Sequence, residues 1–335
     1  MILRDDILLL DVGGTTIKCG DGRCVPVLSA GSRDDIAAAL HDAVWPTAQR
    51  SGEGFGKRET YPSGNASLTP APAPQQPQPT GQPRSNETDP APAPQQPQPT
   101  GQPHSDRHGR PDRPSRIGVA IPGPFDYERG VFLMKHKFEA VYGESFRVLA
   151  GLPEDADVRF VHDVVAVLNG VLGMRDRRSD VALITLGTGL GFAYAKDGQV
   201  QVGPSGSPAR PIYNIPWGDG ILEDYASARG IRAAYERFGG DKETSAAIIA
   251  RKAYGGDEQA LAAYSLLGET LGEALAPVLE ELDITTLLVG GQISRSLSLF
   301  ERPLSNALEG VTVLPAPDGA VFAGIASLFD LTETN

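Results

Sequence analysis

The chain has 335 residues, of which 40% are hydrophobic, and its 42 acidic and 30 basic side chains give a formal net charge of -12. This composition is typical of a soluble globular protein with one large or two medium domains. Because an excess of acidic groups repels nucleic-acid backbones and anionic lipid headgroups, we expect no nucleic acid and no membrane as partner.

The cysteines and the N-terminal residues favour a cytoplasmic location. Cys19 and Cys24 are the two cysteines of the chain, which are too few for a disulfide framework. The first residues place acidic side chains before a short apolar run and show no cleavage-site pattern, unlike a signal peptide. No stretch reaches the roughly 18 apolar residues that a membrane-spanning helix needs.

The first predicted elements are three strands joined by tight turns. Residues 7–11 (ILLLD) are predicted to form a strand, and a glycine turn follows at 12–16 (VGGTT). The segments IKCG and RCVPV, on either side of the pair Asp21–Gly22, are predicted to form two further strands. Residues 34–48 place apolar side chains at helical spacing after an acidic start, which predicts a helix.

Residues 51–115 differ in composition from the rest of the chain. They hold 15 of the 28 prolines, and the segment PAPAPQQPQPTGQP occurs twice, at 70–83 and at 90–103. A stretch with so little apolar surface does not offset the entropy lost on ordering, so we interpret it as a disordered or polyproline-like insertion in a surface loop. A PxxP ligand for a partner protein is the alternative interpretation.

The chain then repeats its opening pattern. From Val181 it has VALITL, the glycine turn GTGLG, FAYAK, the pair Asp197–Gly198 and QVQVG. This weak internal duplication predicts two related domains that face one cleft. Residues 221–283 are mostly helical in pattern, TTLLV at 285–289 is predicted to be a buried strand, and helices are predicted at about 294–308 and near the C-terminus. Together these elements predict mixed α/β layers.

The first glycine corner (residues 13–15) lies within a segment suited to binding phosphate. Gly13 and Gly14 leave backbone amides open to phosphate oxygens, while Thr15 offers a hydroxyl donor and Lys18 a positive charge. Asp11 is a candidate to hold hydrated Mg²⁺. The segment matches neither a P-loop nor a dinucleotide-binding GxGxxG, because a strand follows the turn. An ordinary hairpin turn, with Asp11 capping it and Lys18 solvated, is the alternative.

Two further corners are candidates for nucleotide contacts. The second glycine corner (Gly187, Thr188 and Gly189) occupies the matching position of the duplicated pattern and offers amides to the same phosphate chain. The third glycine corner (Gly290 and Gly291) lies between a predicted strand and a helix, where paired glycines allow flat contact with a purine. Plain turns are the alternative for both.

Three glycine corners in this order resemble the ROK family (repressors, open reading frames, kinases), which is the sugar-kinase branch of the actin-like ATPase and hexokinase superfamily. The resemblance includes GVAIPGPFD at 118–126 and LEDYASARGI at 222–231, and it covers nearly all of the chain outside the insertion. It implies a two-domain α/β fold of the actin-like ATPase (ribonuclease H-like) type with a cleft between the domains. It also implies a small-molecule sugar as substrate, ATP and Mg²⁺ as cofactors, and a homodimer.

The same resemblance suggests domain limits. Residues 1–122 would form a small N-terminal domain that carries the insertion at 51–115, and residues 123–319 a large C-terminal domain. The closing helix, at 320–331, would pack back on the first domain.

Site residues follow from the resemblance position by position. Asp163 takes the place of the general base that accepts the proton of the attacking sugar hydroxyl, and His162, Glu223 and Gly123 take places of sugar contacts. Partial burial at the end of a strand would raise the basicity of Asp163. A helix N-cap is the alternative role for Asp163, and both roles can hold at once. A solvated acid on a helix is the alternative for Glu223.

The sequence also departs from the family pattern. His162 replaces the usual asparagine before the base, which changes one sugar contact from an amide to an imidazole. The zinc motif CxCGxxGCxE is absent, since residues 212–223 contain no cysteine, so we expect no zinc site and suggest that packing by Tyr213 and Trp217 replaces the metal. The EIGH element has no clear counterpart either.

The alternatives for the whole protein therefore stay open. A hexose or N-acetylhexosamine kinase, glucokinase-like in type, is the first hypothesis. A polyphosphate-dependent glucose phosphotransferase and a non-catalytic sugar-binding regulator are the others.

Overall fold

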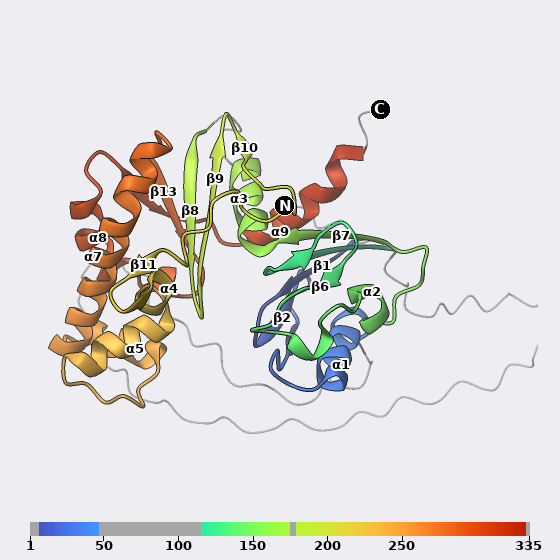
Figure 1. Ribbon diagram of the computed structural model, residues 1–335, viewed down its shortest axis with the longest axis horizontal. Coiled ribbons are helices and arrows are strands. Elements are labelled where there is room, and N and C mark those ends of the chain that lie inside the picture. The colour runs from blue at the N-terminus through green and yellow to red at the C-terminus, as the bar shows by residue number, and fades with distance from the viewer. Residues whose placement is uncertain (1–6, 47–114, 175–178, 333–335) are drawn as a thin grey trace, which may run out of the picture. The chain divides into compact units, whose positions relative to one another are not determined.

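The computed structural model describes residues 7–46, 115–174 and 179–332 (Figure 1). These residues belong to one compact unit. The insertion predicted at 51–115 lies outside the described residues, apart from Ser115. The framework consists of two five-stranded sheets and the helices that cover them.

Both sheets have the same strand order. The first contains β1 (Ile7–Val12), β2 (Thr16–Cys19), β3 (Cys24–Pro26), β4 (Arg116–Ile121) and β7 (Asp157–His162), in the order β3-β2-β1-β4-β7. The second contains β8 (Val181–Leu186), β9 (Leu190–Lys196), β10 (Gln199–Val200), β13 (Thr286–Gly290) and β14 (Thr312–Pro315), in the order β10-β9-β8-β13-β14. In the first sheet β1, β2 and β3 pair antiparallel, and β4 and β7 run parallel to β1. In the second sheet β8, β9 and β10 pair antiparallel, and β13 and β14 run parallel to β8. The internal duplication predicted from the sequence is thus present in the topology.

Helices cover the outer face of each sheet. The core beside the first sheet includes residues of α1 (Arg33–Val44) and α2 (Phe146–Leu149). The core beside the second sheet includes residues of α4 (Leu222–Tyr225), α5 (Ala228–Arg237), α6 (Ala246–Tyr254), α7 (Glu258–Glu281) and α8 (Glu301–Ala307). There are also two small two-stranded sheets. One pairs β5 (Phe125–Asp126) with β6 (Val131–Phe132), and the other pairs β11 (Pro216–Trp217) with β12 (Gly220–Ile221).

The strand sequences match these layers. In β8, Ile184 and Leu186 enter the core with α5–α8, whereas Val181 and Leu183 enter the core on the opposite face. Because alternate side chains of a strand point to opposite faces, a strand covered on both sides needs the continuous apolar run that VALITL provides.

Two helices lie against both sheets. Residues of α3 (Asp163–Met174) and α9 (Ala320–Ala326) occur in the core of the second sheet and in that of the first. The two helices cross where each has a glycine: a Cβ on Gly170 would lie 1.8 Å from the Ala320 carbonyl oxygen, and one on Gly324 would lie 1.8 Å from that of Ala166. The crossing is therefore so close that neither position has room for a side chain.

The C-terminal elements agree in part with the sequence analysis. The closing helix predicted at 320–331 is α9 followed by a 3-10 helix (Ser327–Thr332), and its Ile325 lies against Gly118 of β4. The single helix predicted at 294–308 is wrong, since a 3-10 helix (Ile293–Leu299) and α8 are separated at the fully buried Phe300. The first sheet includes β7, so it contains strands from both sides of the predicted domain boundary between residues 122 and 123.

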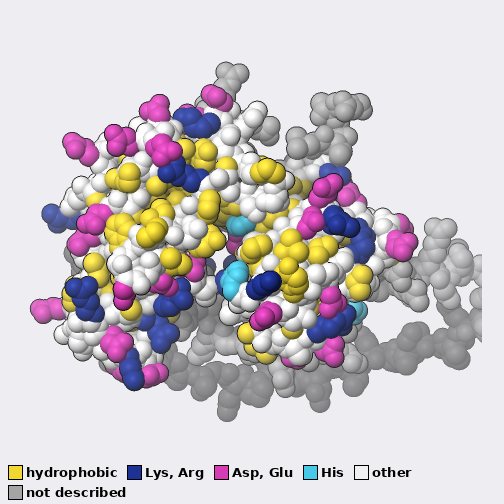
Figure 2. Space-filling model, in the orientation of Figure 1, with side chains coloured by type: hydrophobic (Ala, Val, Ile, Leu, Met, Phe, Trp, Pro, Cys, Tyr) yellow, Lys and Arg dark blue, Asp and Glu magenta, His cyan; other side chains and the backbone are white. Residues whose placement is uncertain are grey.

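The surface carries charges of both signs. On the face shown in Figure 2, acidic and basic side chains are interspersed, with small groups of hydrophobic side chains between them. Among the helices that the structure describes, none is both long and apolar enough to cross a lipid bilayer.

Candidate active site

Two carboxylates lie at the carboxyl ends of parallel strands in the first sheet. Asp11 is next to the last residue of β1, and Asp163 follows β7 as the first residue of α3. Because β1, β4 and β7 are parallel, these ends meet at one edge of the sheet, the edge where ligands bind in open α/β sheets. The two charges influence each other, since the Asp163 carboxylate contributes to a raised pKa of Asp11.

The first glycine corner has the free donors that a phosphate needs. The Gly13 N–H closes the hairpin by donating to the Thr16 carbonyl oxygen over 3.0 Å. The N–H groups of Gly14 and Thr15 find no acceptor in the described part of the chain. Unpaired backbone N–H groups at a turn form an anion-binding concavity, so the corner fits a phosphate group.

Asp11 and Lys18 pair at this corner. The Lys18 ammonium donates to Oδ2 of Asp11 over 3.1 Å, and the Asp11 side chain is 16% exposed against 47% for Lys18. Burial raises the pKa of Asp11, and the Lys18 charge only partly offsets that effect. A raised pKa means that Asp11 gains from a nearby cation, which suits a group that faces a metal ion.

Asp163 is held in place by its chain neighbours. Its Oδ1 lies 2.8 Å from Nδ1 of His162 and accepts the Val164 N–H over 2.7 Å. Its side chain remains 41% exposed, so the carboxylate is within reach of a substrate. Val164 directly follows Asp163, so this contact differs from an N-cap bond, which goes to the second or third residue of the helix.

The direction of the Asp163 pKa is opposite to the one expected from the sequence. Loss of hydration would raise the pKa, but the hydrogen bond from His162, the charge of that ring, the Val164 N–H and the charge of Lys137 outweigh it. The pKa of Asp163 therefore lies below its ordinary value. The carboxylate is therefore ionised at neutral pH, and it is a weaker base than an unperturbed aspartate.

A ring cluster surrounds the residue before the base. The His162 ring lies 5.9 Å from the Tyr127 ring, and a Cβ on Gly123 would lie 3.5 Å from Cδ2 of His162. The Tyr127 hydroxyl donates to the Ile121 carbonyl oxygen over 3.0 Å and shares a hydrogen bond with the Ser207 side chain. Tyr127 therefore connects the end of β4 to Ser207, in the segment after β10. This connection lies near His162 and Gly123.

The second and third glycine corners adjoin each other in the second sheet. The Gly187 N–H donates to the Gly189 carbonyl oxygen over 3.1 Å, while the N–H groups of Thr188 and Gly189 find no acceptor among the residues described. Gly291 has φ +88°, and a Cβ there would lie 2.3 Å from the Leu186 carbonyl oxygen. Gly290 pairs in register with Thr185, which precedes the second corner by two residues.

The second corner also lies near the base. A Cβ on Gly191, just after this corner, would lie 3.4 Å from Val164, the residue that follows Asp163. On its other side, the Ala228 N–H donates to the Gly187 carbonyl oxygen over 2.8 Å, and the hydroxyl of the adjacent Ser227 is buried with no hydrogen-bond partner among the residues that the structure describes. The sequence analysis did not identify Ser227.

Glu223 contacts the second corner directly. Its Oε2 accepts the Leu190 N–H over 2.9 Å and occupies the space beside Gly189, where a Cβ would lie only 2.6 Å away. Its Oε1 is 3.5 Å from the Arg229 guanidinium. The structure therefore shows Glu223 as a support of the corner rather than as a solvated acid.

The sequence analysis missed Lys137. The Lys137 side chain passes Gly14 and is close enough to Asp163 to lower the pKa of that carboxyl. It lines a cavity of about 360 Å³ together with Ser29 and Gly31, and the Ser29 N–H donates to the Gly14 carbonyl oxygen. Three basic residues in the run KHK at 135–137 of an acidic chain were the available signal.

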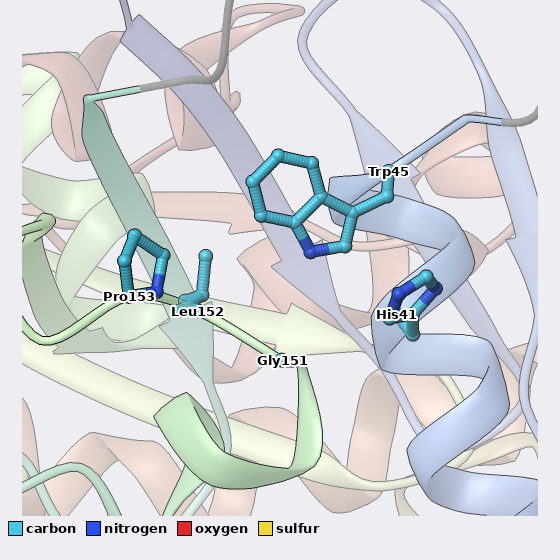
Figure 3. A pocket seen from close by; sticks show the side chains of 5 residues that line it. All are labelled: His41, Trp45, Gly151, Leu152 and Pro153. Carbon is cyan, nitrogen blue, oxygen red and sulfur yellow. The ribbon is translucent and has the colours of Figure 1, made fainter.

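A second cavity, of about 370 Å³, contains none of the predicted site residues. His41 and Trp45, at the end of α1, lie opposite Leu152 and Pro153 (Figure 3). The Trp45 indole N–H donates to the Ala150 carbonyl oxygen over 2.9 Å. This hydrogen bond fixes α1 to the segment after α2.

The fold is similar to that of solved structures of ROK sugar kinases, which have the actin-like ATPase fold. A crystal structure of a ROK family glucokinase from Streptomyces griseus, in complex with glucose and AMPPNP, covers 96% of this chain and 98% of its own, with a TM-score of 0.64 at 19% sequence identity. A sequence model of the ROK family matches residues 218–317. The resemblance to the ROK family is therefore confirmed.

Two relatives are similar in sequence. A glucokinase from Halalkalibacterium halodurans is 28% identical over 240 residues, which are 62% of this chain and 70% of that protein. An N-acetylmannosamine kinase from Escherichia coli is 32% identical over 126 residues, which are 34% of this chain and 42% of that protein.

Proposed function

We propose that this protein is a sugar kinase that transfers the γ-phosphate of ATP to a hydroxyl of a hexose or an N-acetylhexosamine. One observation supports the proposal most. Asp163 is coupled electrostatically to Asp11 beside the first glycine corner, and its neighbour Val164 packs on Gly191 beside the second. A proton acceptor near two sets of free backbone N–H groups fits what phosphoryl transfer needs.

Each group has a role in the reaction. The sugar hydroxyl gives its proton to the Asp163 carboxylate while its oxygen forms a bond to the γ-phosphorus. The bond from that phosphorus to the bridging oxygen of ADP breaks at the same step. Free N–H groups at Gly14, Thr15, Thr188 and Gly189 hold phosphate oxygens, which keeps the donor aligned.

Mg²⁺ fits beside Asp11. When bound, the ion would supply positive charge to the phosphates, and its charge would stabilise the ionised form of Asp11, which burial disfavours. As the resemblance to the family suggests, Asp11 would hold the ion through its water shell. Asp11 would then keep Mg²⁺ next to the first corner.

The sugar site follows from the cluster around His162. Gly123, Tyr127 and His162 lie together next to Asp163, so a sugar hydroxyl that contacts them is within reach of the base. The imidazole offers one donor or one acceptor in place of an amide. We expect the choice of sugar to depend on this cluster.

The test is the release of ADP from ATP in the presence of single sugars. Glucose, mannose, fructose, N-acetylglucosamine and N-acetylmannosamine form the panel, with a reaction that lacks sugar as the blank. Sugar-dependent ADP release supports the proposal, and sugar binding without ADP release would favour a regulator instead. A parallel assay with inorganic polyphosphate identifies the donor.

The oligomer and the location are further proposals from the resemblance. We expect a homodimer in the cytoplasm. Light scattering on the purified protein tests the first of these, and a mass of one chain would contradict it.

A further inference from the structure

Lys137 enters the candidate site from a segment that the sequence analysis did not use. It follows β6 and comes just before the 3-10 helix Glu139–Val141. A Cβ on Gly14 would lie 3.6 Å from Cδ and 3.8 Å from Cε of Lys137. The aliphatic part of the Lys137 side chain thus runs along the first glycine corner. This places the ammonium group at the candidate site.

The backbone beside Lys137 is fixed in an unusual conformation. Phe138 has φ 56° and ψ 27°, in the left-handed region that a bulky residue rarely adopts. Its side chain is fully buried, with its ring 5.4 Å from that of Phe132, and its N–H donates to the Ser29 carbonyl oxygen over 2.6 Å. Such strain persists where the surroundings enforce it, and it occurs preferentially at functional sites.

The Lys137 ammonium has no carboxylate partner in the part of the chain that the structure describes. Lys18, on the other side of the same corner, is paired with Asp11. The Asp163 carboxylate is near enough to feel the charge of this partly buried ammonium but is not bonded to it, which leaves the ammonium's hydrogen-bond donors open to an anionic ligand. Of these two lysines at the first corner, Lys137 is the one left available to a ligand.

We propose that Lys137 is a catalytic residue that binds the phosphoryl group in transfer, between the first glycine corner and Asp163. This inference rests on the proposed function. The transferred group must lie between its donor, held at the corner, and the hydroxyl held at Asp163, and Lys137 reaches both places. It binds the group through its ammonium and takes no proton, since the hydroxyl proton goes to Asp163 and ADP leaves with the electrons of the broken bond.

The test compares Lys137→Met with Lys137→Arg and with a matched control. Methionine keeps the stem beside Gly14 and removes the charge, whereas arginine keeps the charge. Lys135→Met makes the same change two residues earlier, where the ammonium is exposed over the Tyr142 ring at 5.3 Å. We expect kcat to fall about 10²- to 10³-fold in Lys137→Met, as for the loss of one transition-state donor. We expect Lys137→Arg to recover part of it and Lys135→Met to match the wild type.

A binding measurement keeps the inference separate from the proposed function. Lys137→Met should weaken binding of AMPPNP about tenfold and leave binding of ADP unchanged, because only AMPPNP carries the third phosphate. Equal values for Lys137→Met and Lys135→Met in turnover and in AMPPNP binding would overturn the inference. If the wild type phosphorylates no sugar, the proposed function fails, and the AMPPNP and ADP affinities still decide the role of Lys137. If the methionine variant does not fold, Lys137→Gln, which also removes the charge, takes its place.

Discussion

The protein has two halves, one built around the first sheet (β1 to β4 and β7) and one around the second (β8 to β10, β13 and β14). They share a strand order but differ in the side chains at the edge where the parallel strands end. The first half puts Asp11, Lys18 and Asp163 at the carboxyl ends of its strands. At the matching edge of the second half, β8 and β13 end in Leu186 and Gly290, and Glu223 is the charged residue that contacts the second glycine corner directly.

The helices after the last strand of each sheet show the same difference. After β7, α3 begins with the ionised Asp163, whereas after β14 the chain passes the exposed Asp318 before α9 begins. Duplication thus supplies two similar sets of backbone donors, while reactive charges are concentrated in the first half. We infer that both halves hold the phosphates of the donor and that the first half also carries the proton transfer.

The largest expected effect tests this division directly. We expect Asp163→Asn to lower kcat about 10²- to 10⁴-fold, since it removes the positioned base. Asp318→Asn makes the same change before the matching helix of the second half, and we expect its turnover to equal that of the wild type. Steady-state kinetics give kcat for both variants. An equal fall in kcat in Asp163→Asn and Asp318→Asn would mean that the two halves do not differ in this way.

The helix crossing joins the halves, and a substitution there gives the next largest effect. We expect Gly324→Ala to lower the free energy of unfolding by about 1–3 kcal/mol, because the new methyl group has no room beside the Ala166 carbonyl oxygen. Gly173 is the matched control on α3, where a Cβ meets nothing within 4 Å. Gly173→Ala should raise stability by roughly 0.5–1 kcal/mol. Urea unfolding compares the two, and a stable Gly324→Ala variant would contradict the close crossing.

A smaller effect, on the KM for ATP, is expected from a substitution of Glu223 in the second half. Glu223→Gln weakens a charge-assisted hydrogen bond to the Leu190 N–H, which we expect to cost about 1 kcal/mol, or roughly fivefold in KM for ATP. The KM for the sugar should stay the same. Glu236→Gln, an exposed acid on α5, is the control. A rise in the sugar KM alone would show instead that Glu223 binds the sugar.

The smallest expected effect concerns the pH dependence of stability in the first half. Because the folded protein raises the pKa of Asp11, the native state binds its proton more tightly than the unfolded chain does. The resulting stabilisation is present at low pH and is lost as the pH rises through the raised pKa. Asp11→Asn removes this dependence, so the variant should gain stability relative to the wild type between the ordinary pKa of about 3.9 and neutral pH. The free energy of unfolding is measured for both proteins across this pH range. A difference between them that does not change with pH would argue against a raised pKa of Asp11.

The elements of the fold were largely predictable, because local patterns specify them. Strands such as VALITL and the turns between them are encoded within a few residues, and the repeated pattern predicted the matching sheets. The broken helix at Phe300 was not predictable, since its cause is burial against distant residues.

The arrangement of the site was predictable only where a motif carried it. The glycine corners are such motifs. Lys137 lies more than 120 residues from Gly14, and no local pattern indicates that the two meet. The direction of the Asp163 pKa depends on His162 and Lys137 together, so it emerges only when the chain is folded.

The position of α9 in the chain affects how the protein is made. This helix covers Gly118 and crosses α3 at Ala166, yet it follows them by more than 150 residues. A nascent chain that has not yet reached residue 326 therefore exposes the apolar side of α3 and of β4. Contacts between segments so far apart form slowly, and until they form the partly made protein is open to aggregation and to chaperones.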